Sequence, residues 1–119
     1  MNENIKDERP DVLNSATLKD AIFTSDGDRI EYALTLTYKD FCPYELFIDC
    51  RNPHYSEFLT ALSVLVSRML RAGFELDVIV SDLFDIHSPV TGHFCQQEYI
   101  PSLMATIGKQ LYNHNHCRR

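Results

Sequence analysis

The stretch LSVLVSRMLRAGF (residues 62–74) decides the fold, because no other part of the chain is apolar over so many residues. Residues 55–72 contain neither Pro nor Gly, and apolar residues recur there at the three- and four-residue spacing that places side chains on one helical face. The pattern predicts a central helix over residues 55–72, roughly 27 Å long at about 1.5 Å per residue. Asn52-Pro53 marks its start and Gly73 its end. Such a face must be buried against another layer.

Three segments before this helix predict β-strands. Residues 29–38 and 44–50 alternate between apolar and polar side chains, which is typical of half-buried strands. Residues 16–23 predict a first strand, although their pattern is ambiguous. The Asp26-Gly27 pair predicts a tight hairpin, because glycine readily takes the positive φ that such a turn needs. Together the segments predict a three-stranded antiparallel meander with the central helix on one face.

Two further helices are predicted after Gly73. Residues 75–86 and 99–114 carry apolar side chains at helical spacing, and Pro101 is tolerated in the first turn of the second. Residues 87–97 between them predict an irregular loop, because they are rich in turn formers. The fold class is therefore α+β, a small three-stranded antiparallel sheet packed with two to three helices.

The length of 119 residues fits one domain. We expect a flexible N-terminal segment over residues 1–9, a single domain over residues 10–112, and a flexible tail over residues 113–119. The sheet face away from the central helix carries too few charges to be fully solvated, so we also expect a homo-oligomer that uses this face or the amphipathic helices. The face is formed by Ala33, Thr35, Thr37 and Phe47.

The charge balance limits the partners. The chain has 17 acidic and 11 basic residues, a net charge of −6, which argues against a nucleic-acid polymer as partner. A small anionic ligand stays open, because it needs only one or two local Arg residues and a helix end. No apolar run approaches the ~18 residues of a membrane span, and the polar residues 1–8 do not resemble a signal peptide. We therefore expect no membrane partner and a cytoplasmic location.

The residues with reactive side chains predict neither a metal site nor an active site. The four cysteines form no C-x-x-C pair, and we expect free thiols. The spacing of His87, His93 and Cys95 fits no standard zinc pattern, which leaves a metal site there open but not expected. The tail group of His114, His116 and Cys117 fits none either. No Ser lies in a G-x-S-x-G elbow, so we expect no catalytic residue, no cofactor and no enzymatic activity.

The run LVSRMLRAGFELDVIVSDLFDI (residues 65–86) resembles the core of the TSCPD domain. The matching pattern is Leu, an apolar residue and Ser, then Leu-Arg-x-Gly, then Leu, Ile and Leu at helical spacing. Further similarity lies in Arg9-Pro10 with Leu13 and Thr17, in residues 44–48, and in the last helix. This domain is found at the C-terminus of adenosylcobalamin-dependent ribonucleotide reductases and as free-standing proteins, many of them in phages.

The chain departs from this family at the string that names it. Where the family has Thr-Ser-Cys-Pro-Asp, residues 98–102 read EYIPS and keep only Pro101. The Cys that supports a metal-site interpretation in relatives is therefore absent. The reductase barrel is absent as well, so the resemblance does not imply reduction of ribonucleotides.

The junction between the third strand and the central helix is the best candidate site. Arg51 and Asn52 lie where the first free N–H groups of the helix converge, which suits an anion, and Tyr55 or Phe47 is available to stack a base. The alternative interpretation is an ordinary capped loop. Three more residues complete the predicted ligand-binding set: Arg71 at the end of the helix, which alternatively is only a C-terminal charge, and Thr91 and His93 in the long loop.

The resemblance and the absence of catalytic groups together imply a non-catalytic protein that binds a small nucleotide. More narrowly, a free-standing domain of this size is similar to phage anti-defence sponges that sequester the cyclic nucleotide signals of CBASS and Thoeris immunity. The expected ligand is a cyclic oligonucleotide or a cyclic ADP-ribose variant. The alternative is a detached regulatory or assembly module that interacts with ribonucleotide reductase.

Overall fold

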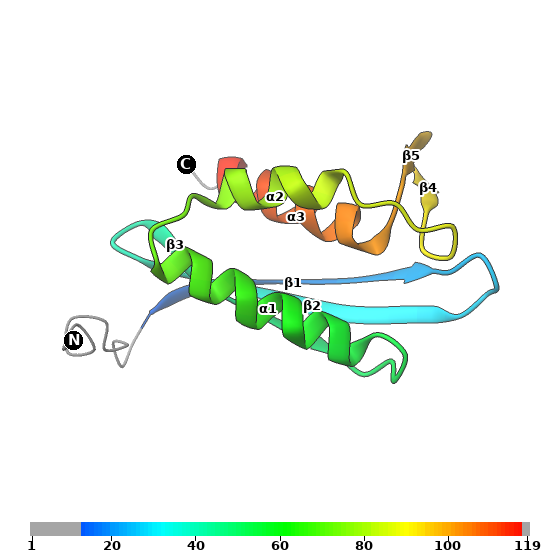
Figure 1. The fold of residues 1–119 in the computed structure, drawn as a ribbon, viewed down its shortest axis with the longest axis horizontal. Helices are drawn as coiled ribbons and strands as arrows, with labels where there is room; N and C mark the ends of the chain where they lie inside the picture. Colours follow the sequence, from blue (N-terminus) through cyan, green and yellow to red (C-terminus); the bar gives the residue numbers. More distant parts are fainter. Residues whose placement is uncertain (1–12, 118–119) are drawn as a thin grey trace.

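The computed structural model describes residues 13–117 (Figure 1). The predicted N-terminal segment 1–9 and the Arg9-Pro10 motif lie outside the described residues. The elements in chain order are β1 (Asn14–Phe23), β2 (Arg29–Lys39), β3 (Cys42–Cys50), α1 (Ser56–Arg71), α2 (Leu76–Phe84), β4 (His93–Cys95), β5 (Glu98–Ile100) and α3 (Leu103–Cys117).

The first three strands form an antiparallel sheet in the order β1-β2-β3, as the alternation predicts. The register of β1 on β2 runs without interruption from Asn14 opposite Tyr38 to Phe23 opposite Arg29. Gly27 in the connecting turn has a φ of 90°. The antiparallel meander and the α+β class are therefore confirmed.

All three helices contribute to one hydrophobic core on one face of the sheet. Alternate residues of β2, from Ile30 to Leu36, are buried in the same cluster as residues of each helix, among them Leu59, Val80 and Ile107. Helix α1 packs against β3, whereas α2 and α3 lie side by side (Figure 1). The opposite face of the sheet carries no helix in the described part of the chain.

The predicted helices over 55–72 and 75–86 correspond closely to α1 and α2. The third helix, predicted over 99–114, begins and ends later, at Leu103 and Cys117. Ser102 fixes its start, because its Oγ accepts the Ala105 N–H at 3.0 Å. At its other end the His116 Nε2 lies 2.7 Å from Asp77 of α2, so the segment predicted as a tail is helical as far as Cys117.

The predicted irregular loop over 87–97 is wrong in part. It contains β4, which pairs with β5 in a two-stranded hairpin. The turn residues Gln96 and Gln97 both have positive φ, at 53° and 69°. Sequence reasoning missed this hairpin because positive φ at two successive positions normally requires Gly, Asn or Asp.

Candidate functional site

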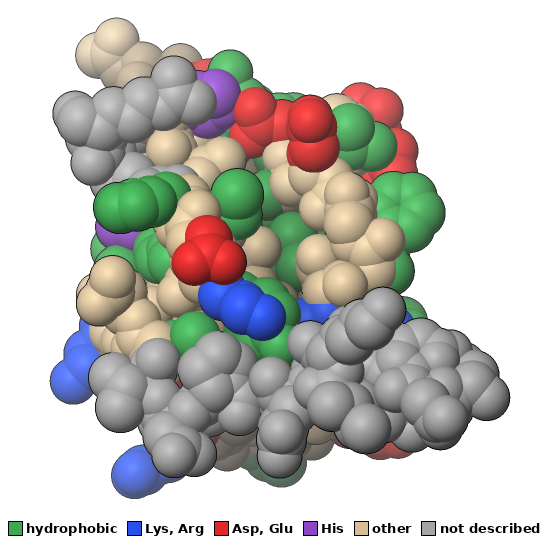
Figure 2. All heavy atoms as spheres, turned by 90° about the vertical axis from the view of Figure 1, so that its left-hand side faces the viewer, with side chains coloured by type: hydrophobic (Ala, Val, Ile, Leu, Met, Phe, Trp, Pro, Cys, Tyr) green, Lys and Arg blue, Asp and Glu red, His purple; other side chains and the backbone are tan. Residues whose placement is uncertain are grey.

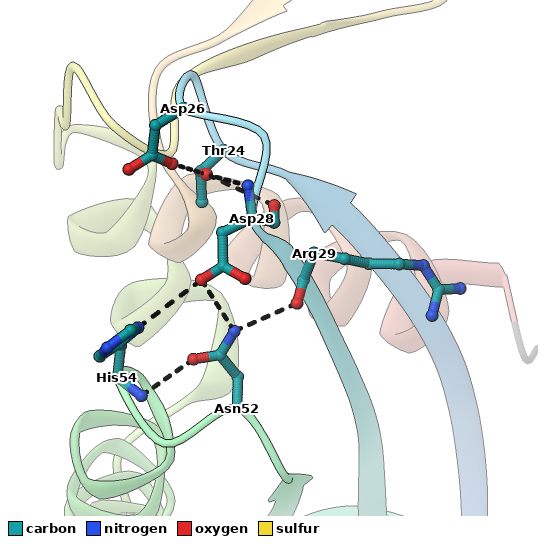
Figure 3. A network of polar contacts seen from close by, with 6 residues as sticks. All are labelled: Thr24, Asp26, Asp28, Arg29, Asn52 and His54. Atoms are coloured by element: carbon teal, nitrogen blue, oxygen red, sulfur yellow. Dashed lines mark hydrogen bonds and ion pairs between the residues drawn. The ribbon is translucent and has the colours of Figure 1, made fainter.

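Asn52 fastens the β3–α1 junction to the β1–β2 hairpin. Its Nδ2 donates to Asp28 Oδ2 and to the carbonyl oxygen of Arg29, both at 3.1 Å. Its Oδ1 accepts the backbone N–H of His54 at 2.9 Å, and the His54 Nδ1 lies 3.7 Å from Asp28 Oδ2 (Figure 3). Both amide N–H donors of Asn52 are therefore used inside the protein, and its role in the structure is to position the loop.

Tyr55 precedes α1 and packs against the hydrophobic core with its side chain half-buried. Burial raises the pKa of its phenol, and the carboxylates of Asp26 and Asp28 raise this pKa further. The phenol therefore stays protonated at neutral pH. Tyr55 does not line the hollow that contains Arg51.

Arg51 lines a hollow of about 690 Å³ on the helix-free face of the sheet, together with residues of the β1–β2 hairpin. Three other residues that line this hollow were not predicted from the sequence. They are the basic residues Lys19 and Arg29 and the aromatic residue Phe23. The register explains the grouping, because Phe23 lies opposite Arg29 and residue 19 opposite residue 33. All of these positions alternate with the core residues and so face away from the helices.

The hollow is lined by as many basic side chains (Lys19, Arg29 and Arg51) as acidic ones (Asp20, Glu31 and Asp49), but not all of them are paired. Arg29 forms an ion pair with Glu31. Lys19 and Arg51 form no ion pair with any residue in the range 13–117, although the Asp49 carboxylate also lines the hollow. The ammonium group of Lys19 and the guanidinium group of Arg51 are therefore available for an anion. They lie beside Phe23, which is 61% exposed.

Asp20 also lines the hollow, but its carboxylate is engaged on the helix side of the sheet. Its Oδ2 accepts the Gln110 Nε2 at 2.6 Å, and Gln110 Oε1 in turn accepts the Tyr32 hydroxyl at 2.9 Å. Burial, with the nearby Asp20 charge, raises the pKa of the Tyr32 phenol well above its usual range, so this hydroxyl remains a donor. Asp20 therefore connects β1 to α3.

Phe47 lies on the same open face, on β3, and is 49% exposed. The register places it in one row with Thr35 and Thr17, whose hydroxyls lie 3.0 Å apart. This row is two residues along the strands from Lys19 and Asp49. Phe47 therefore shares a face with Arg51 but is not among the residues that line the hollow.

Arg71 lies elsewhere. Its Nη1 is 3.3 Å from Oε2 of the buried Glu45, so its charge compensates a buried carboxylate. Figure 2 looks onto the end of the molecule where α1 passes into α2. The basic side chains visible there are few and separated, among hydrophobic and acidic ones.

Thr91 and His93 belong to a third region. The buried Thr91 Oγ1 accepts the Leu103 N–H at 3.0 Å and so caps α3, and the His93 Nδ1 lies 3.0 Å from the Thr91 carbonyl oxygen. His93 lines a second hollow of about 510 Å³ beside Phe94 and Lys109, which adjoins the hollow of Arg51 at residues 20, 21 and 23. The seven predicted site residues therefore do not form one site.

Neither a group of metal-binding side chains nor a membrane-spanning helix is found among the described residues. No three side chains of His, Cys, Asp or Glu within residues 13–117 are grouped so that they could hold a metal ion, and this range includes His87, His93 and Cys95. No helix in the same range is long and apolar enough to span a membrane.

Comparison with known proteins gives one match. The sequence model of the TSCPD domain matches residues 5–115, nearly the whole chain. Neither the curated proteins nor the solved structures contain a match to this chain. Residues 98–102, which differ from the string that names the family, form β5 and the Ser102 cap of α3 in the structure. With a match of this extent, the chain belongs to the TSCPD domain family.

Proposed function

We propose that the protein is a non-catalytic module that binds a small nucleotide in the hollow on the open face of the sheet. The observation that carries the proposal is that Arg51 and Lys19, both without an ion-pair partner in the described residues, face the same hollow beside Phe23. In a chain with a net charge of −6, such a grouping of cations favours an anionic ligand.

The size and chemistry of the hollow support this ligand class. A volume of about 690 Å³ lies within the usual range for small-molecule sites. A guanidinium group binds phosphate oxygens through two parallel hydrogen bonds, and an exposed aromatic ring offers a stacking surface for a base. The residues that line the hollow include no Ser, Cys or His, so these three types of nucleophile are absent from it.

We further propose that the biological role is sequestration of a cyclic nucleotide immune signal, as in phage anti-defence sponges of the CBASS or Thoeris type. Membership of a family with free-standing phage members supports this role. The ligand is then a cyclic oligonucleotide or a cyclic ADP-ribose variant that is bound and released intact.

A second candidate is a module that docks on ribonucleotide reductase. The exposed rings of Phe23 and Phe47 favour it, because aromatic side chains on an open face are frequent in protein interfaces. The two candidates differ in the partner, since the first predicts a complex with a nucleotide and the second a complex with the enzyme.

The test is a thermal-shift screen against a panel of linear and cyclic nucleotides, followed by calorimetry on Arg51→Ala. A ligand at 100 times its dissociation constant stabilises the protein by about 2.7 kcal/mol. We expect Arg51→Ala to weaken binding by about 1.5–3 kcal/mol and to leave the fold intact, because the side chain is exposed.

Arg68→Ala is the matched control, because Arg68 is an exposed arginine on α1 that does not line the hollow. It should leave the affinity unchanged. Equal affinity of Arg51→Ala and the native protein would contradict the proposed site and favour the hollow around His93. A complex with purified ribonucleotide reductase, without any nucleotide hit, would favour the second candidate.

A further inference from the structure

Strand β1 has an open edge, to which no strand of residues 13–117 pairs. It is an outer strand of ten residues that pairs with β2 along its whole length. The Ala21 N–H donates to the Asp20 Oδ1 at 2.8 Å, which indicates that it points away from β2. Because main-chain groups alternate along a strand, the N–H and C=O groups of Ser15, Thr17 and Lys19 point outward as well. All three of these residues are exposed.

The other outer strand confirms this alternation. The Leu46 N–H and C=O of β3 both bond to the Ser67 hydroxyl of α1, so they point away from β2. Leu46 lies opposite Leu36, which in turn lies opposite Ala16. In an antiparallel sheet, Leu36 must then direct its main-chain groups to β1, and Ala16 must direct its own to β2. The main-chain N–H and C=O groups of the odd-numbered residues of β1 therefore point to the open edge.

An apolar hollow lies beneath this edge. It has a volume of about 530 Å³ and is bounded by β1, by Leu34 and Leu36 of β2, and by Gln110, Leu111, Asn113 and His114 of α3. Leu18 lies in it and is 42% exposed, although it points to the same side of the sheet as the core residues. The core is therefore incomplete at the β1 edge.

We propose that a second copy of the chain pairs its β1 with this edge, antiparallel and about a two-fold axis. The outward groups of one strand would bond to those of the other and join the two sheets into one of six strands. The core-facing side chains of the second β1 would cover Leu18 and close the hollow. This proposal is independent of the nucleotide site.

The sequence of β1 selects one register. Residues directly opposite each other in two paired strands point to the same face of the sheet. The two-fold axis must therefore pass between one residue and the same residue of the second copy. Near the centre of the strand, this residue is Leu18, Lys19 or Asp20. Centring on Lys19 or Asp20 would oppose two like charges, which is destabilising. Centring on Leu18 opposes two leucines in the apolar hollow and places Lys19 opposite Thr17 of the second copy.

This register uses the whole strand. Four outward residues in each copy, Ser15, Thr17, Lys19 and Ala21, would exchange about eight hydrogen bonds across the axis. Like charges would meet in the registers centred on Lys19 and on Asp20, which disfavours both of them. Strand β1 is therefore complementary to itself, which is the reason to assign the edge to a second copy and not to an unrelated peptide.

The oligomeric state tests the proposal. We expect light scattering at micromolar concentration to give about 28 kDa, twice the 13.8 kDa of one chain. Leu18→Glu should yield a monomer, with dissociation favoured roughly 100-fold, because two carboxylates would meet at the axis. Val64→Glu, at a 55% exposed position on α1, is the matched control and should remain a dimer. A native monomer at this concentration, or a folded Leu18→Glu dimer, would overturn the proposal.

A second variant keeps the test decisive should Leu18→Glu fail to fold. Across the proposed axis the two Leu18 Cα atoms would lie about 4.5–5.5 Å apart, within the range that a disulfide spans. Leu18→Cys should therefore form a covalent dimer under mild oxidation on a non-reducing gel. Thr17→Cys, displaced from the axis, should form no more than the native chain. Equal cross-linking of the two variants would exclude the proposed register.

Discussion

The two outer strands of the sheet differ in how their edges are closed. Strand β3 is covered by α1, and the Ser67 hydroxyl donates to the Leu46 C=O at 3.0 Å and accepts the Leu46 N–H at 2.9 Å. At the outward positions of β1, the hydrogen bond found among the described residues is the local one from the Ala21 N–H to Asp20 Oδ1. One hydroxyl group from a packed helix therefore satisfies the outward main-chain groups at Leu46 of β3, whereas no helix does the same for the described part of β1.

This difference shows what one residue of the family-like run does. Ser67 follows Leu65 and Val66 in the segment that resembles the TSCPD core, and it is buried in the middle of a helix. Serine is not a strong helix former, so its place there needs a reason outside the helix. The two bonds to Leu46 supply it, because an exposed strand edge is a site of unwanted pairing. In this way α1 protects the β3 edge from such pairing.

The largest effect on stability is expected when the Ser67 hydroxyl is removed. Ser67→Ala removes both hydrogen bonds and leaves the buried Leu46 N–H and C=O without their partner. We expect the free energy of unfolding to fall by about 2–3 kcal/mol, since each unsatisfied buried group costs about 1–3 kcal/mol and alanine recovers a little through helix propensity. Urea unfolding with an unchanged m-value would measure it.

Ser81→Ala is the matched control for this change. Ser81 is also a helical serine, but it is exposed and its hydroxyl bonds only to the Val78 carbonyl of its own helix, at 2.7 Å. Its loss should change stability by less than about 0.5 kcal/mol. Equal effects of the two substitutions would mean that Ser67 does not close the β3 edge.

A smaller effect is expected at the end of β3, where Asn52 holds the junction. Asn52→Ala removes its three hydrogen bonds to Asp28, Arg29 and His54. Because the site is partly exposed, water replaces some of them, and we expect a loss of about 1–2 kcal/mol in thermal unfolding. Asn113→Ala on the exposed surface of α3 serves as the control. A large fall in nucleotide affinity without loss of stability would instead make Asn52 a ligand contact.

Much of the fold could be predicted, because it depends on local patterns. The alternation over β2 and the long apolar run of α1 each determine an element and its buried face. The β4–β5 hairpin could not be predicted, since Gln96 and Gln97 take positive φ without the residues that normally allow it. The last turn of α3 was also missed, because it depends on contacts between His116 and a distant residue of α2.

The candidate site depends on register, which limits prediction further. Arg51 was identified from its place between a strand and a helix, but most of the residues around it come from β1 and β2, 18 to 32 positions earlier. The signal for them was available, because the turn at Gly27 aligns β1 with β2 and alternation then places Lys19 and Phe23 on the face of Arg51. What the sequence did not show is that Asn52 and Tyr55 face inward.

The smallest effect is expected in the β1–β2 turn, at the end of the open edge. Asp26 accepts a hydrogen bond from the Thr24 hydroxyl, which lowers the pKa of the Asp26 carboxyl below its ordinary value of 3.8 (Figure 3). A folded-state pKa below the unfolded one means that the carboxylate stabilises the fold above pH 3.8, and that this stabilisation is lost as the pH falls through the folded pKa. Asp26→Asn should therefore lower the melting temperature by about 1–2 °C at neutral pH, and the difference should disappear in acid.

Thr24→Ser, which keeps the hydroxyl, should retain the pH dependence, whereas Thr24→Val should abolish it. A difference between Asp26→Asn and the native protein that stayed constant down to pH 2 would show that this hydrogen bond does not depend on the charge of Asp26.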